Sequence, residues 1–164
     1  KLIQLGCYQV CLNDEFCTAN PRLVQNYIKT YMDEIESTRL SVHFHDNRGL
    51  GLANVFASYE AGIRTFRCSL GGSGVHAELE QESKNRKLAS KQYPSVPTED
   101  VVCMFEEMGI DTGIDVKKLI NCGSNMKNLV GKRLHSRMLS NGIDDKTVQG
   151  ICELASKLFP EAGI

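Results

Sequence analysis

The feature of this sequence that most restricts its fold is a regular alternation of short apolar segments with longer amphipathic segments. Strands are predicted for residues 2–9, 39–45 and 65–70, with a helix between each pair. Connections this short require parallel strands joined by right-handed crossovers through the helices. The alternation therefore predicts an α/β fold, in which functional groups gather at the carboxyl ends of the strands.

The helix starts agree with this order of elements. Asn20 is a good amino-terminal cap with Pro21 at the first helical position, and the second helix is expected from Leu50 to Ala61. Thr98 is expected to cap a third helix, in whose first turn acidic residues suit the helix dipole. Further helices are predicted from Asp115, with a possible break at Gly123, and over residues 144–159.

Two histidines stand at the carboxyl end of the second predicted strand. His43 and His45 are separated by one residue, so on a strand their side chains leave the same face and can converge on one divalent ion. His-x-His also occurs on ordinary strands where each ring is only hydrogen-bonded, and that reading stays open for the isolated motif. Asp46 follows directly, either to orient one imidazole or to cap the next helix.

Glycines follow the third predicted strand. Gly71 and Gly72 permit a positive φ and close approach of the backbone to a ligand, and Ser73 follows them. The next stretch, near residues 75–97, is charged and poorly periodic, which indicates either an exposed insertion or a lid over the site.

Composition excludes several classes of partner. The formal net charge is -1 without a cluster of Lys or Arg, so neither nucleic acid nor an anionic membrane surface is expected as a partner. No apolar run approaches the length of about 18 residues that a membrane span needs. The seven cysteines include no Cys-x-x-Cys pair and are expected to be free thiols in a reducing compartment, either the cytoplasm or the mitochondrial matrix.

Taken in order along the chain, five motifs resemble the carboxyl-terminal part of the hydroxymethylglutaryl-CoA lyases. More broadly they resemble the metal-dependent lyases and synthases built on a TIM barrel. The similarity extends over roughly residues 1–125. The motifs that carry it are His43 to Asn54, Ala61 to Ile63, Leu70 to Gly74, Thr98 to Val102 and Met108 to Asp115.

The resemblance implies the carboxyl-terminal portion of a (β/α)₈ barrel, with about three of its strands followed by extra helices. Residues 1–109 would form the partial barrel with its insertion, and residues 110–164 a helical extension. A full barrel takes about 250 residues, so three strands cannot close one. The open sheet edges would need an oligomer, or pairing with the missing half-barrel.

The resemblance also implies a divalent cation, magnesium or manganese, held by an aspartate of the first barrel strand and by two histidines. His43 and His45 match the histidine positions, whereas the aspartate has no counterpart in this chain. Two imidazoles without an acid would bind magnesium poorly, and zinc would suit such a site better.

Three positions depart from the family pattern. Ser73 stands where the family has a catalytic cysteine, Ser95 replaces an asparagine that helps to bind the metal, and Gly6-Cys7-Tyr8 stands for the Gly-Asp-Thr strand end. Ser73 remains the positional candidate for proton transfer, with His76 as a possible substitute.

Two functions follow from this resemblance. The first is cleavage of an acyl-CoA substrate, 3-hydroxy-3-methylglutaryl-CoA, to acetyl-CoA and acetoacetate. The alternative is a catalytically inactive fragment or remnant of such a lyase that acts as a binding or structural module.

Overall fold

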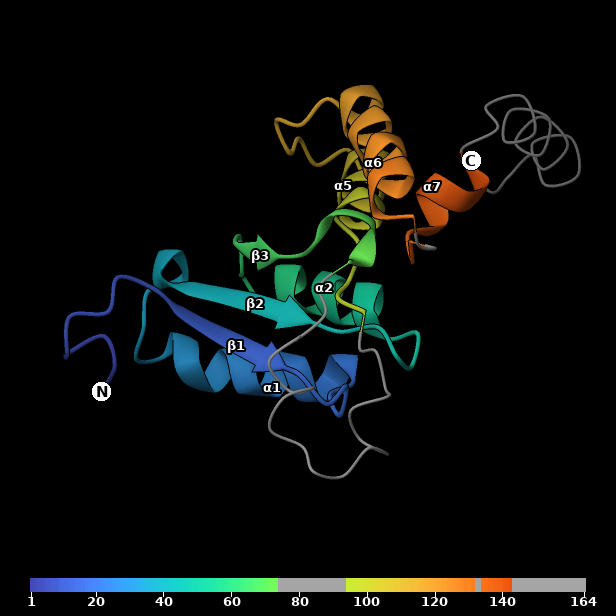
Figure 1. The fold of residues 1–164 in the computed structure, drawn as a ribbon. Coiled ribbons are helices and arrows are strands. Elements are labelled where there is room, and N and C mark those ends of the chain that lie inside the picture. The colour runs from blue at the N-terminus through green and yellow to red at the C-terminus, as the bar shows by residue number, and fades with distance from the viewer. Residues whose placement is uncertain (74–93, 132–133, 143–164) are drawn as a thin grey trace, which may run out of the picture.

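The computed structural model describes residues 1–73, 94–131 and 134–142, and Figure 1 shows the arrangement of the elements. Within these ranges, short strands alternate with helices, and three α-helices follow the last strand. In chain order the elements are β1 (Val10–Asp14), α1 (Pro21–Met32), the 3₁₀ turn η1 (Ser37–Arg39), β2 (Leu40–Phe44), α2 (Gly51–Glu60), β3 (Phe66–Arg67), the 3₁₀ turn η2 (Leu70–Gly72), α5 (Thr98–Glu107), α6 (Val116–Val130) and α7 (Arg137–Asn141).

The three strands form one parallel sheet in the order β1-β2-β3. The predicted α/β fold is therefore confirmed. Leu12 pairs with Val42, which in turn pairs with Phe66, and this face of the sheet packs against the helices. Asn13, His43 and Arg67 form the adjacent register row, so their side chains leave the opposite face. One face of the sheet is thus apolar and the other polar.

The core lies between the sheet and helices α1, α2 and α5. Apolar side chains from all four parts meet there because each helix presents one apolar stripe to the sheet. Its buried members are Val24, Ile28, Leu40, Val42, Phe44, Val55, Ala57, Ile63, Val96, Val101 and Phe105.

The first strand begins later than its sequence pattern suggests. Residues 2–9 do not form a strand, and Val10–Asp14 pairs with Leu40–Phe44 instead. The carboxylate of Asp14 accepts hydrogen bonds from the backbone N–H groups of Thr18 and Ala19, which turns the chain at the strand's end. The expected strand over residues 2–9 is therefore wrong, because alternation alone does not show which segment finds a hydrogen-bonding neighbour.

The helix starts agree with expectation in two cases and differ in a third. Asn20 caps α1 by accepting a hydrogen bond from Leu23 N at 3.0 Å, and Asp115 caps α6 in the same way through Lys118 N. Thr98 does not cap α5, because it already lies inside the helix and Pro97 occupies the cap position without a side-chain hydrogen bond.

Gly123 does not interrupt α6, which is continuous over its 15 residues. Instead it lies where α6 approaches α5, and a Cβ atom there would be 2.4 Å from Glu99 Oε1. Its role is close helix packing. The helix expected over residues 144–159, residues 75–93 of the predicted insertion, and His76 lie outside the described residues. No helix within the described ranges is long and apolar enough to cross a membrane.

Candidate metal and catalytic site at the carboxyl ends of the strands

The two histidines of the His-x-His motif lie together at the end of β2. Their ring centroids are 4.8 Å apart and the rings are nearly perpendicular, with an interplanar angle of 88°. His45 is buried, whereas His43 is partly open to solvent. Packing therefore fixes the position of His45, while the ring of His43 can be reached from solvent.

A hydrogen bond to a backbone carbonyl orients the ring of His43. Nδ1 of His43 lies 2.8 Å from the carbonyl oxygen of Arg67, its register partner on β3. Because a carbonyl only accepts, Nδ1 must carry the proton, and Nε2 presents a lone pair. Histidines that bind metal ions commonly have this arrangement.

The segment that carries Ser95 closes over the histidine pair. Ser95 forms an antiparallel bridge with His45, and its hydroxyl oxygen lies 3.4 Å from His43 Nε2. Two backbone hydrogen bonds fix the segment to β2, from Val96 N to Phe44 O and from Asp46 N to Pro94 O. The last residues of the predicted insertion thus lie against the sheet, with Ser95 fully buried.

The glycine turn lies on the other side of Ser95. Gly71 and Gly72 both adopt positive φ, at 63° and 69°, and a Cβ atom on Gly72 would be 3.0 Å from the carbonyl oxygen of Ser95. Only glycine permits this combination of backbone angle and close approach. Ser73 follows directly, so the structure places it after a turn that contacts the Ser95 segment.

Glu99 is the residue of this region that sequence reasoning missed as a functional candidate. Its position in the sequence indicates only an acid in the first turn of α5, yet its side chain is fully buried and both carboxylate oxygens accept from Gly71 N, at 2.9 and 2.8 Å. Burial raises the pKa of this carboxyl group, against the lowering effect of the hydrogen bonds. No local signal in the sequence distinguishes such an acid from an exposed one.

The carboxylates of the nearby aspartates accept hydrogen bonds from backbone N–H groups. Asp46 Oδ1 accepts from Gly51 N at 2.7 Å, so the side chain caps α2, and the carboxylate of Asp14 accepts from the turn that follows β1. Within the described residues, no three His, Cys, Asp or Glu side chains gather into a possible metal site. The donors present are two imidazole nitrogens beside a hydroxyl, and they fit part of a divalent-cation site. The further oxygen ligands that such a cation prefers would have to come from other residues.

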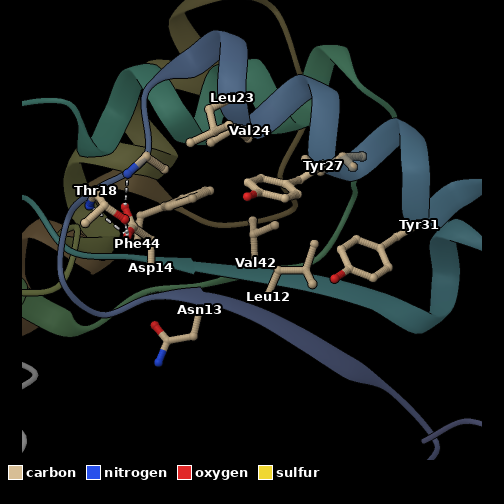
Figure 2. Close-up of a pocket in the computed structure, with 12 residues that line it drawn as sticks. Leu12, Asn13, Asp14, Thr18, Leu23, Val24, Tyr27, Tyr31, Val42 and Phe44 are labelled. Atoms are coloured by element: carbon tan, nitrogen blue, oxygen red, sulfur yellow. Dashed lines mark hydrogen bonds between the residues drawn. The ribbon is translucent and has the colours of Figure 1, made fainter. Parts of the chain in front are cut away.

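The polar end of the sheet is distinct from an apolar hollow of about 290 Å³ between the sheet and α1. Figure 2 shows Leu12, Val42 and Phe44 pointing into this hollow with Tyr27 and Tyr31 of α1, while Asn13 points to the opposite side of the strand. Because His43 shares a register row with Asn13, the hollow lies on the other face of the sheet from the histidine ring.

Among the described residues, Cys17, Cys68 and Cys103 are not activated nucleophiles. The six cysteines in the described ranges are free thiols, as the sequence predicts. Burial raises the pKa of Cys17, Cys68 and Cys103, which keeps these thiols protonated at neutral pH.

Comparison with known protein families decides the relationship. The model of the family described as HMGL-like matches residues 1–126. The chain belongs to the HMGL-like family. The resemblance of the sequence motifs to the hydroxymethylglutaryl-CoA lyases is thereby confirmed.

Individual HMGL-like relatives give the same picture. The chain is 30% identical over 138 residues to the mitochondrial hydroxymethylglutaryl-CoA lyase of Gallus gallus. The matched region covers 84% of this chain and 43% of that protein. It is 31% identical over the same length to a hydroxymethylglutaryl-CoA lyase of Bacillus subtilis, with the same two coverages.

A solved HMGL-like structure matches in three dimensions. The HMG-CoA lyase of Acinetobacter baumannii, in complex with coenzyme A and 3-methylmalate, superposes with a TM-score of 0.76 at 34% identity, covering 87% of this chain and 43% of that one. The chain thus spans about two fifths of the length of the relatives it matches, and its three-stranded parallel sheet with helices corresponds to part of a TIM barrel.

Proposed function

We propose that this chain contributes the histidine half of a metal-dependent lyase site that cleaves 3-hydroxy-3-methylglutaryl-CoA to acetyl-CoA and acetoacetate. The observation that carries the proposal is the pair of adjoining imidazoles at the end of β2, beside the buried Ser95 hydroxyl, in a chain of the HMGL-like family. The match to a lyase crystallised with coenzyme A supports an acyl-CoA substrate.

His43 and His45 are the proposed metal ligands. His43 would bind through Nε2, because its Nδ1 proton is held by the carbonyl of Arg67. A bound divalent cation would act as a Lewis acid on the oxygens of the substrate. Magnesium or manganese would need oxygen ligands beyond the described residues, whereas zinc would accept two imidazoles more readily.

The reaction requires two proton transfers. A base removes the proton of the 3-hydroxyl group, the C2–C3 bond breaks, and its electrons pass to the thioester carbon chain as the enolate of acetyl-CoA. An acid then protonates that carbon, while the former hydroxyl carbon becomes the ketone of acetoacetate. Ser73 is the positional candidate for one transfer, and its weakly acidic hydroxyl would make the step slower than the family's thiol does.

The alternative function is a catalytically silent module of the same family. It is favoured by the absence of a third acidic or thiolate ligand among the described residues, and by Ser73 in place of the family cysteine. Such a module would bind a metal ion weakly and would not turn over substrate.

Both functions call for a partner at the sheet edges. β1 and β3 are the edge strands of the described sheet, and exposed aromatic residues of α1, Tyr27 and Tyr31, border the hollow beside β1. We propose that a complementary half-barrel or a second subunit covers this region, because exposed strand edges invite pairing.

The deciding experiment measures acetoacetate formation and metal affinity with the same preparations. The chain is assayed alone and mixed with the amino-terminal segment of the Bacillus subtilis lyase that precedes the matched region, with Mg²⁺, Mn²⁺ or Zn²⁺ present. The lyase proposal expects turnover in the mixture, and its loss when His43 and His45 are both changed to alanine. The same double change should weaken Mn²⁺ or Zn²⁺ binding measured by calorimetry.

His135→Ala is the matched control, because it removes an exposed imidazole and keeps the backbone N–H that His135 donates to Gly71 O. Turnover should be unchanged in this variant. Metal binding through the histidines without turnover would favour the silent module, and binding unaffected by the double change would reject both roles for His43 and His45.

A further inference from the structure

The glycine turn before Ser73 is held from two directions. On one side the carboxylate of Glu99 accepts from Gly71 N, and on the other His135 N donates to Gly71 O at 2.8 Å. The side chain of Leu134 also covers Gly71, where a Cβ atom would be 2.6 Å from Leu134 Cδ1. The backbone N–H and the backbone carbonyl of Gly71 are therefore both held by residues distant in the sequence.

Asp100, the residue after Glu99, holds the segment that contains Leu134 and His135 in place. Asp100 Oδ1 accepts from Ser136 Oγ at 2.6 Å and from Met138 N, while Oδ2 accepts from Arg137 N. These bonds fix the start of α7 to α5. Two adjacent acids of α5 thus act together. Glu99 holds the glycine turn directly, and Asp100 holds the segment that covers the turn.

The carboxylate of Glu99 is closely packed against α6. Gly123 of α6 lies so close that a Cβ atom would meet Glu99 Oε1, and the side chain is fully buried. A buried carboxylate without hydrogen-bond donors would be strongly unfavourable, so the bonds from Gly71 N offset the cost of burying this side chain.

The glycine turn also contacts the proposed catalytic site. Gly72 lies against the carbonyl of Ser95, and the hydroxyl of the same Ser95 lies beside Nε2 of His43. A change in the turn would therefore move both Ser73 and the wall of the histidine pair.

We infer that Glu99 is a positioning residue, which through Gly71 holds the glycine turn against Ser95 and so sets Ser73 and the histidine pair in one arrangement. This inference rests on the proposed lyase function. It assigns Glu99 no contact with substrate or metal; its effect passes through the backbone.

The test compares Glu99→Leu, which cannot accept a hydrogen bond, with Glu99→Gln, which keeps a neutral acceptor. Nuclear magnetic resonance follows the Gly71 amide and the imidazoles of His43 and His45, and the half-barrel mixture supplies kcat and KM. Glu107→Leu is the matched control, an exposed carboxylate on the same helix. Ile63→Val, at a buried core position, controls for loss of stability alone.

Glu99→Leu is expected to shift the Gly71 amide and both imidazole signals, and to lower kcat at least tenfold with KM changed less than twofold. Glu99→Gln should recover part of each effect, and neither control should reproduce them. An unmoved Gly71 amide, or kcat equal to that of the unchanged chain, would overturn the inference.

The two proposals can fail separately. If the unchanged chain shows no turnover, the lyase function fails and the imidazole signals decide the positioning role. Shifts in Glu99→Leu that are absent in Glu107→Leu support that role, and unshifted imidazoles reject it.

Discussion

The hydroxyl oxygen of Ser95 lies 3.4 Å from Nε2 of His43, although the two residues come from segments far apart in the sequence. The antiparallel bridge between Ser95 and His45 produces this contact. The nitrogen proposed to bind the metal therefore already faces a protein oxygen.

Ser95→Ala should weaken Mn²⁺ binding by about tenfold, the lower end of the effect of removing a group that orients or supports a metal ligand. The loss is expected because this hydroxyl lies 3.4 Å from His43 Nε2, the nitrogen proposed to bind the metal. Calorimetric titration of the two proteins measures it. Ser124→Ala, an exposed serine on α6, should leave the affinity unchanged. Equal affinities for Ser95→Ala and the unchanged chain would contradict the prediction.

The pH dependence of stability should reveal the buried carboxyl of Glu99. Its pKa is raised in the folded chain by burial, so between the ordinary value near 4.5 and the raised value the folded state binds more protons than the unfolded state. The free energy of unfolding contributed by this group therefore falls as pH rises through that window.

Urea unfolding of the unchanged chain and of Glu99→Gln at several pH values from 4.5 to 7 measures this effect. The stability of the unchanged chain relative to the variant should be greatest at the acidic end and decline toward neutrality. Glu107→Gln, which removes an exposed carboxylate from the same helix, provides the baseline. A difference that rises with pH beyond this baseline would show that the hydrogen bonds outweigh burial.

Gly123→Ala should destabilise the chain by about 1–3 kcal/mol, the usual cost of overpacking. The new methyl group would lie 2.4 Å from Glu99 Oε1 and 2.7 Å from Leu139 Cδ1, so α6 would have to move away from α5. Chemical denaturation gives the free energy. At the next position, Ser124→Ala is exposed and should be neutral or slightly stabilising through helix propensity. A stabilised Gly123→Ala would mean that α6 is free to shift.

Asn20→Ala should lower the free energy of unfolding by about 1 kcal/mol, because Leu23 N at the start of α1 loses its hydrogen-bond acceptor. Asn26→Ala removes the same side chain from an exposed position inside the helix and should have little effect or a small stabilising one. Thermal unfolding of both variants compares them directly. Equal losses from the two changes would argue against the capping role of Asn20.

Local signals along the chain are sufficient to predict several features of this fold. The helix that begins at Asn20-Pro21, the parallel order of the strands and the placement of His43 and His45 at a strand end all follow from spacing, caps and connection length. These features depend on residues close together in the chain, so a linear pattern is sufficient to predict them.

Which segments pair and which acids are buried depends on contacts between distant parts of the chain. β1 lies at Val10–Asp14 because those residues, and not residues 2–9, find a hydrogen-bonding partner in β2. Gly6-Cys7-Tyr8 therefore precedes this strand, which ends at Asp14, whose carboxylate holds the following turn.

The same reason explains Glu99, Ser95 and Gly123. Each acts through a neighbour that is distant in the sequence: Gly71 for Glu99, His43 for Ser95, and Glu99 for Gly123. Burial and close approach between such segments depend on the packing of whole elements, and no local pattern encodes them. The sequence thus located the histidine pair, while the packing of α5, α6 and the glycine turn decided what surrounds it.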